Sequence, residues 1–241
     1  MNAIETNGLH KTYKGVTAVE DLTLNVPEGC LFSLLGVNGA GKTTSIRMLT
    51  CLTKPDSGDA RIMGHSILTE TAQVKALVNV SPQETAVAPY LTVRENLELI
   101  AGVYGSRSGK ADAAEVLTRM GLEPVAERRA RALSGGWQRR LSIAMALVSK
   151  PKLLFLEEPT LGLDVLARRE LWQVIEALKG EMTVVLTTHY LEEAEALSDL
   201  VGVMHAGRLI AVGTVPELLT QTGTASLEDA FLALCGEGRA I

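Results

Sequence analysis

The stretch GVNGAGKT, residues 36–43, decides the fold of this chain. It fits the pattern G-x-x-x-x-G-K-[ST], whose glycines let the backbone curl around an anion. It follows an apolar run at residues 30–36 and precedes a segment with helical spacing at residues 42–52. A buried strand, a glycine loop and a helix form the context that a phosphate-binding loop requires. These flanking elements argue against a glycine-rich turn that matches by chance, so we predict a nucleotide site on an α/β core of the phosphate-loop type.

The motif also predicts which side chains hold the nucleotide. Lys42 supplies a mobile positive charge for the terminal phosphates, and the Thr43 hydroxyl is a ligand for Mg²⁺. A phosphate loop alone does not distinguish GTPases, kinases and motors, so other parts of the chain must identify the class. The residues of the loop expected to bind nucleotide are Asn38, Gly39, Ala40, Gly41, Lys42, Thr43 and Thr44.

Composition narrows the possible classes of protein. The chain has 241 residues, is 46% hydrophobic and carries a formal net charge of −5. The acidic balance argues against a nucleic-acid partner. Its three cysteines lie far apart without a CxxC pair, which is typical of reduced thiols in a cytosolic protein. No uncharged apolar run reaches the roughly 18 residues that span a bilayer. We therefore expect a cytoplasmic protein that meets a membrane only through a partner.

Strand and helix signals alternate along much of the chain. Residues 18–26 read as a strand, as do residues 152–157 and 183–189, and residues 165–180 read as the helix between the last two. This alternation predicts a mostly parallel sheet, accompanied by an N-terminal antiparallel β subdomain. A hairpin is expected to turn at Ala206-Gly207.

Helical composition dominates residues 85–150. Segments 91–105 and 109–122 are rich in alanine, leucine and charge, and residues 134–150 place leucine, alanine and valine on one face. We interpret this region as a helical subdomain inserted into the α/β core. Residues 1–241 are then one domain.

Five further motifs follow in order, and together with the phosphate loop they make the chain resemble the nucleotide-binding subunit of an ABC transporter. The match covers nearly the whole chain, and the signature separates ABC ATPases from other phosphate-loop proteins. The motifs are the Q-loop SPQET with Gln83, the signature LSGGWQRR at 133–140, the Walker B strand LLFLEEP at 153–159, the D-loop LGLD ending at Asp164, and the switch segment TTHYLEEAE with His189.

The resemblance implies a mechanism in which two subunits pair head to tail and sandwich ATP. Ser134, Gly135 and Gly136 would then contact the γ-phosphate that the partner chain binds, and the glycine amides at a helix N-terminus suit that role. Asp164 would reach across the dimer. The pair would be a homodimer or a heterodimer with a second ATPase subunit. Tyr13 would stack on adenine.

The Walker B segment ends in two glutamates, Glu157 and Glu158, and Pro159 fixes their register against the family pattern. Glu157 takes the position of the usual aspartate, so the resemblance makes it a Mg²⁺ ligand together with Thr43 and Gln83. Glu158 takes the catalytic position and would activate water. We expect the alternation of side chains along a strand to send the two carboxylates to different sides.

The other catalytic residues implied are Gln83 and His189. One departure from the family pattern is Glu157 itself, whose extra methylene could displace the ion. The other is Trp137, which stands where the family has glutamine and packs against either the partner chain or the helical subdomain.

The function implied is ATP hydrolysis that powers transport through separate transmembrane permease subunits, with the chain peripheral on the inner face of the membrane. The segment SLEDAFLALCG, residues 226–236, resembles the tails of bacterial and archaeal drug and sodium exporters, which favours export. A non-transport ABC ATPase and a catalytically weak regulatory subunit are the alternatives. The sequence does not identify the transported substrate.

Overall fold

A six-stranded sheet in the order β10-β9-β3-β8-β7-β6 forms the centre of the computed structural model, which describes residues 1–237. Strands β9, β3, β8, β7 and β6 are parallel, and β10 runs antiparallel to β9. The prediction of a mostly parallel sheet is therefore confirmed. The strands are β3 (Leu31–Leu35), β6 (Val78–Ser81), β7 (Leu153–Glu157), β8 (Thr183–Thr188), β9 (Leu200–His205) and β10 (Arg208–Gly213).

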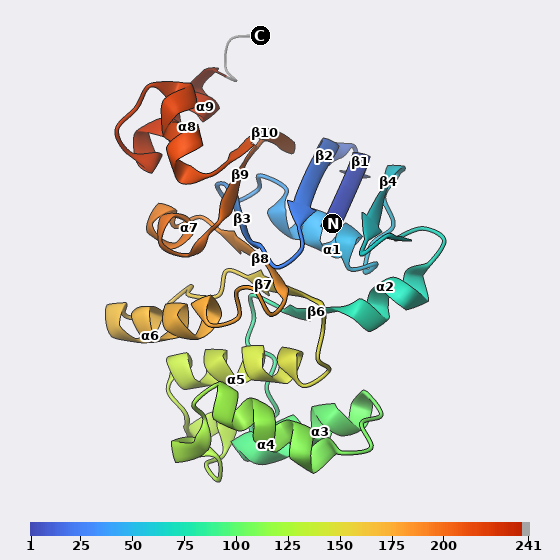
Figure 1. Cartoon of the computed structure of the whole chain (residues 1–241), viewed down its shortest axis with the longest axis vertical. Helices are drawn as coiled ribbons and strands as arrows, with labels where there is room; N and C mark the ends of the chain where they lie inside the picture. The colour runs from blue at the N-terminus through green and yellow to red at the C-terminus, as the bar shows by residue number, and fades with distance from the viewer. Residues whose placement is uncertain (238–241) are drawn as a thin grey trace.

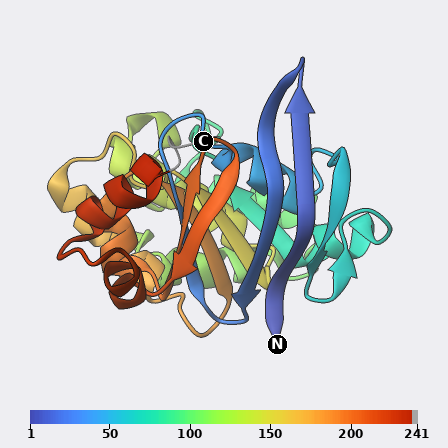
Figure 2. The same ribbon diagram turned by 90° about the horizontal axis from the view of Figure 1, so that it is seen from above.

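A second, antiparallel sheet stands beside the first and confirms the expected N-terminal β subdomain. Its order is β2-β1-β4-β5, and its strands are β1 (Asn2–Tyr13), β2 (Val16–Pro27), β4 (Ser57–Ile62) and β5 (His65–Ser66). Figure 2 shows β1 and β2 as a long two-stranded ribbon whose tip projects beyond the rest of the molecule. The sequence reasoning identified only β2. In β1 the regular alternation of buried and exposed positions breaks down over its last residues, which weakens the strand signal.

Helices cover both faces of the central sheet. In Figure 1, α1 lies on the side of the antiparallel sheet, whereas α5 and α6 lie on the opposite side and α3 and α4 extend beyond α5. The helices are α1 (Lys42–Leu49), α2 (Thr71–Leu77), α3 (Val93–Val103), α4 (Gly109–Arg119), α5 (Gly135–Leu147), α6 (Val165–Glu176), α7 (Leu191–Leu197), α8 (Val215–Thr222) and α9 (Leu227–Glu237).

Strand alternation divides the apolar side chains of β7 between two cores. In β7, Leu153 and Phe155 join the core that contains α1 and the antiparallel sheet. Leu154 and Leu156 join the core that contains α3, α4, α5 and α6. All four are fully buried, which is typical of a parallel strand covered on both faces.

Local signals set several element boundaries. Thr92 accepts a hydrogen bond from the Glu95 amide and Glu95 caps Thr92 in return, so α3 begins with a capping box. The hairpin turn is confirmed at Ala206 and Gly207, whose φ angles of 46° and 82° are those of the turn that suits a two-residue hairpin.

Helices α3, α4 and α5 fall within residues 85–150, and the extent of a helical subdomain there stays a prediction, as does a single domain over residues 1–241. None of the helices within residues 1–237 combines the length and apolar character that a bilayer crossing requires.

A buried carboxylate joins α7 to α6. Glu193 is fully buried, and its Oε1 accepts a hydrogen bond from Trp172 Nε1 at 3.2 Å. Burial raises the pKa of Glu193 above its ordinary value, because the charged form loses hydration. The folded chain therefore holds this proton more tightly than the unfolded chain does.

We predict that Glu193→Gln stabilises the protein increasingly as the pH rises. The native protein loses stability as the pH rises from the ordinary Glu pKa of 4.5 through the raised folded pKa, by about 1.4 kcal/mol for each unit of the shift. A glutamine keeps the oxygen that accepts from Trp172 and has no proton to lose. Thermal unfolding at about pH 5 and about pH 8 measures the effect. Glu192→Gln, at the exposed neighbouring position, should show no such gain, and an equal gain in both variants would contradict the prediction.

Candidate functional site

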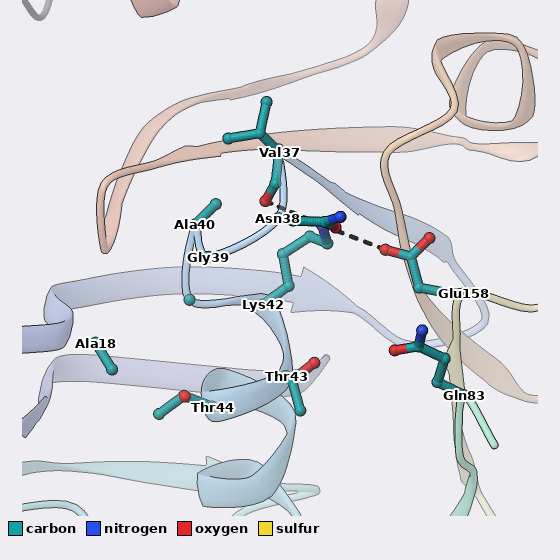
Figure 3. A pocket seen from close by; sticks show the side chains of 11 residues that line it. Ala18, Val37, Asn38, Gly39, Ala40, Lys42, Thr43, Thr44, Gln83 and Glu158 are labelled. Atoms are coloured by element: carbon teal, nitrogen blue, oxygen red, sulfur yellow. Dashed lines mark hydrogen bonds and ion pairs between the residues drawn. The ribbon is translucent and has the colours of Figure 1, made fainter. Parts of the chain in front are cut away.

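Four parallel strands end at one edge of the central sheet, and the segments that follow them meet there. The loop after β3 begins at Gly36, and Gln83, Glu158 and His189 follow β6, β7 and β8. A pocket of about 250 Å³ opens at this edge, with Gln83 and Glu158 facing the phosphate loop across it (Figure 3). It is lined by Ala18, Val37, Asn38, Gly39, Ala40, Gly41, Lys42, Thr43, Thr44, Gln83 and Glu158.

The loop conformation requires glycine at Gly41. Its φ is 106°, in the left-handed region, and a Cβ built there would lie 2.4 Å from the carbonyl oxygen of Ala18. Helix α1 begins at the next residue, and no side chain caps its N-terminus. The first amides of α1 therefore point towards the pocket without a side-chain acceptor, which suits an anion.

Lys42 is the cation of the pocket. It is 6% exposed, and its Nζ donates to the carbonyl oxygens of Gly36 at 2.5 Å and Val37 at 3.3 Å. The same Nζ lies 3.3 Å from Oε1 of Glu158. The ammonium is thus held between the phosphate loop and a carboxylate from the segment after β7.

Glu158 joins Lys42 to His189. Its Oε2 lies 2.7 Å from Nδ1 of His189, so the imidazole presents its Nδ1 proton to the carboxylate and leaves Nε2 for another partner. Glu158 has a φ of 44°, which is strained for a residue with a side chain, and its amide donates to the carbonyl oxygen of Thr187 at 3.0 Å. Backbone strain of this kind is held in place by the surrounding structure and is concentrated at functional sites.

The prediction that strand alternation sends the Glu157 and Glu158 side chains to different sides is wrong, because only Glu157 belongs to the strand. Strand β7 ends at Glu157, so Glu158 lies beyond the strand in the left-handed conformation. Alternation would place Glu157 on the face of Leu153 and Phe155, and a continued strand would have sent Glu158 to the opposite, helical face. The left-handed residue instead turns the Glu158 carboxylate into the phosphate-loop pocket.

Oxygen donors for a hard cation are present at the pocket. The Thr43 hydroxyl and the Gln83 amide line it, whereas Glu157 is buried and is not among the lining residues. Burial raises the pKa of Glu157, whereas the charges of Arg47 and Arg139 oppose that rise. A hydroxyl, an amide oxygen and a carboxylate suit Mg²⁺. Within residues 1–237 no group of three or more His, Cys, Asp or Glu side chains forms a metal cluster by itself.

The signature residues lie outside this pocket. Ser134 occupies the N-cap position of α5, but its side chain makes no capping hydrogen bond. Ser134 and Gly135 are exposed, so the helix presents a free hydroxyl and free amides. Gly136 packs closely on α6, where its Cβ would lie 3.1 Å from that of Ala167.

The structure places Trp137 within its own chain. Its ring packs against the core of the helical region, with the Arg140 guanidinium 4.8 Å from the ring centre. Arg140 also pairs with Glu170 of α6 at 3.1 Å. Of the two expected arrangements for Trp137, the structure supports packing against the helical region.

Asp164 and Tyr13, two further predicted nucleotide contacts, also lie outside the pocket, and both are accessible. The Oδ1 of Asp164 caps α6 by accepting from the amides of Leu166 and Ala167, both at 2.9 Å. Tyr13 ends β1 and is 41% exposed, with Nζ of Lys11 5.5 Å from its ring centre.

Sequence reasoning missed some residues of this site. Ala18 lines the pocket through backbone proximity, for which a sequence carries no signal. Arg139 of α5 is buried and donates to main-chain carbonyls on both sides of the site. The sequence could have predicted its burial, because Arg139 shares a helical face with the buried residues Ile143 and Ala146.

Comparisons with known proteins agree with this geometry. The model of the family described as ABC transporter matches residues 19–161. The daunorubicin/doxorubicin resistance ATP-binding protein DrrA of Streptomyces peucetius is 44% identical over 225 residues, which cover 92% of this chain and 68% of the relative. The linearmycin resistance ATP-binding protein LnrL of Bacillus subtilis is 39% identical over 223 residues, covering 91% of this chain and 72% of the relative.

Solved structures have the same fold. The structure of an ATP-binding subunit of an ABC transporter has a TM-score of 0.84 and 29% identity, and the match covers 96% of this chain and 99% of that one. A dimeric post-hydrolysis state of an ATP-binding cassette, bound to ADP and Pi, has a TM-score of 0.78 and 27% identity over 88% of this chain and 98% of that one.

Proposed function

We propose that this chain, which belongs to the ABC transporter family and is an ATP hydrolase, powers export of a substrate through separate transmembrane subunits. One observation carries the proposal: the fold brings Lys42, Gln83 and Glu158 into one phosphate-loop pocket and leaves the free N-terminus of α5 outside it. The pocket is a site for ATP. The N-terminus of α5 is an anion site for which its own chain supplies no anion.

Relatives support the direction of transport. DrrA and LnrL are named as resistance ATP-binding proteins for daunorubicin or doxorubicin and for linearmycin, and resistance to a drug is consistent with its export. By analogy, we propose that the substrate of this system is a drug. The chain acts on the cytoplasmic side of the membrane, held there by its permease partner.

The pocket residues have distinct proposed roles. Lys42 and the α1 amides bind the phosphates of ATP, and these phosphates compete with Glu158 for Lys42. Glu158 orients and deprotonates the attacking water, as a general base for in-line attack on the γ-phosphate. His189 holds the Glu158 carboxylate through Nδ1 and offers Nε2 to the γ-phosphate. Tyr13 stacks on the adenine.

Thr43, Gln83 and Glu157 are the proposed residues around Mg²⁺. When bound, Mg²⁺ neutralises charge on the phosphates of ATP. Glu157 contributes a buried carboxylate, and the Thr43 hydroxyl and Gln83 amide contribute neutral oxygens.

A second copy completes the site in this proposal. Ser134, Gly135 and Gly136 of one chain face the γ-phosphate held by the other, and Asp164 lies close to the shared interface. The exposure of Ser134 and Gly135 supports this arrangement, because an unsatisfied helix N-terminus favours an anion. A homodimer and a heterodimer with a second ATPase subunit both satisfy it.

One observation favours a rival function. Glu157 replaces the shorter carboxylate of the family pattern, and a displaced Mg²⁺ would slow hydrolysis, as in a catalytically weak regulatory subunit. A non-transport ABC ATPase is the other rival.

We predict that Glu158→Gln forms an ATP-dependent dimer without turnover. The amide keeps the size of the side chain but cannot act as a base, so hydrolysis should fall by at least about 10²-fold. ATP binding should persist, because Lys42 loses only a competing carboxylate. Light scattering should show a dimer with Mg²⁺-ATP and a monomer without it. Adding Lys42→Ala to Glu158→Gln should remove the dimer, and a monomer under all conditions would contradict the sandwich.

Magnesium dependence should separate the two glutamates. Glu157→Asp should keep or raise the ATPase rate, because it restores the shorter carboxylate. Glu157→Gln should raise the Mg²⁺ concentration for half-maximal rate by about tenfold, since a neutral amide is a poorer partner for a hard cation. A magnesium titration of the two variants and the native chain measures this. Normal hydrolysis by Glu157→Gln at limiting Mg²⁺ would exclude the assigned role, and a negligible native rate would favour the regulatory subunit.

Transport requires a membrane partner, and we predict that the tagged chain co-purifies with an integral membrane protein from detergent extracts of its host. Tyr90, which is 69% exposed in the segment after Gln83, is the proposed contact. Tyr90→Glu should reduce recovery of the membrane protein, because it places a charge in an apolar interface. Val16→Glu, at a position 70% exposed in the β1–β2 ribbon, is the matched control. Recovery of ribosomes or DNA instead would support the non-transport rival.

A further inference from the structure

Arg139 is a buried arginine whose hydrogen bonds go to the main chain. It lies on α5 and is 4% exposed. Its Nε donates to the carbonyl oxygen of Pro159 at 2.9 Å, and its Nη2 donates to that of Glu157. Its Nη1 donates to the carbonyl oxygens of Pro82 and, at 3.3 Å, Gln83. One rigid guanidinium thus joins a helix to two separate loops.

The two loops are those that carry the proposed catalytic groups. Pro82 and Gln83 lie on the segment after β6, and the Gln83 side chain lines the pocket. Glu157 and Pro159 flank Glu158 on both sides. Because Glu158 has a strained left-handed backbone, it needs surrounding contacts to hold it, and the two carbonyls bound by Arg139 lie immediately before and after it.

Charge explains how the guanidinium remains ionised in the interior. Burial lowers the pKa of Arg139 to about 10, and the nearby charges of Glu193, Glu157 and Glu158 oppose this shift. Arg139 is therefore protonated at neutral pH. Its planar fork reaches several carbonyls at once, which a lysine cannot do.

Arg139 lies within the signature segment 133–140, near the exposed N-terminus of α5. Helix α5 begins at Gly135, about one turn before Arg139, so both lie on one continuous helix. A displacement of the exposed N-terminus of α5 would be transmitted through Arg139 to the backbone on both sides of Glu158 and to that of Gln83.

We propose that Arg139 is a positioning residue for ATP hydrolysis, which fixes Glu158 and Gln83 relative to each other and to the signature end of α5. The proposal rests on the roles proposed above for Glu158 and Gln83. It assigns to Arg139 no contact with ATP. Its effect is on turnover rather than on nucleotide binding, because the residues that hold the phosphates belong to α1 and its loop.

The test uses Arg139→Met and Arg139→Lys in the full chain. Methionine removes every donor, whereas lysine keeps the charge and can bond only part of the carbonyl set. We expect kcat to fall about tenfold or more in Arg139→Met and less in Arg139→Lys, with KM and ATP affinity within about threefold of the native values. Arg119→Met is the control, since Arg119 is partly exposed, pairs with Glu181 at 2.6 Å and does not line the pocket, and its kcat should not change.

A double-mutant cycle with Gln83→Ala separates positioning from general support of the fold. If Arg139 acts through Gln83, Arg139→Met should reduce kcat by a smaller factor in the Gln83→Ala background than in the native background. A purely structural role predicts the same factor in both backgrounds, and that result would overturn the proposal. So would an unchanged kcat in Arg139→Met, or failure of Arg139→Lys to fold. Full activity of Glu158→Gln would instead overturn the proposed catalytic role of Glu158, independently of Arg139.

Discussion

The register of the parallel strands is the constraint on which the site depends. Leu35 of β3 pairs with Thr188 of β8, and Glu157 of β7 pairs with Thr187 of the same strand. The ends of these strands are therefore level to within about one residue, at one edge of the sheet. Groups that are far apart in the sequence reach a common pocket without any long loop. This is the usual location of ligands in open α/β sheets, outside the carboxyl ends of the strands.

The charges at this edge balance one another. Lys42 and His189 both contact the Glu158 carboxylate, so a buried anion is compensated by a cation and a hydrogen-bond donor. The phosphates of ATP would bring more negative charge to the same cation. In the mechanism we propose, Lys42 exchanges its ion pair with the Glu158 carboxylate for one with a phosphate of ATP. This exchange leaves Glu158 available to bind the attacking water.

Helix α5 connects the two halves of the proposed machinery. At its exposed end it presents the signature, and Gly136 packs there against Ala167 of α6. One turn later, Arg139 binds the backbone on both sides of Glu158. Nearby, Arg140 stacks on Trp137 and pairs across to α6. In our proposal this helix links partner binding to the chemistry, because the buried Arg139 binds the backbone on both sides of Glu158 about one turn from the exposed Ser134 and Gly135.

The sequence by itself determined the strand–loop–helix unit, the order of the motifs and the parallel sheet. These are local patterns: glycine spacing specifies a loop around an anion, and apolar runs specify buried strands. It did not determine β1, the direction of the Glu158 carboxylate or the bonds of Arg139. The left-handed backbone at Glu158 and the carbonyls that bind Arg139 depend on contacts between segments far apart in the sequence. Only the packed sheet and helices bring those segments together, so only the tertiary structure could decide these features.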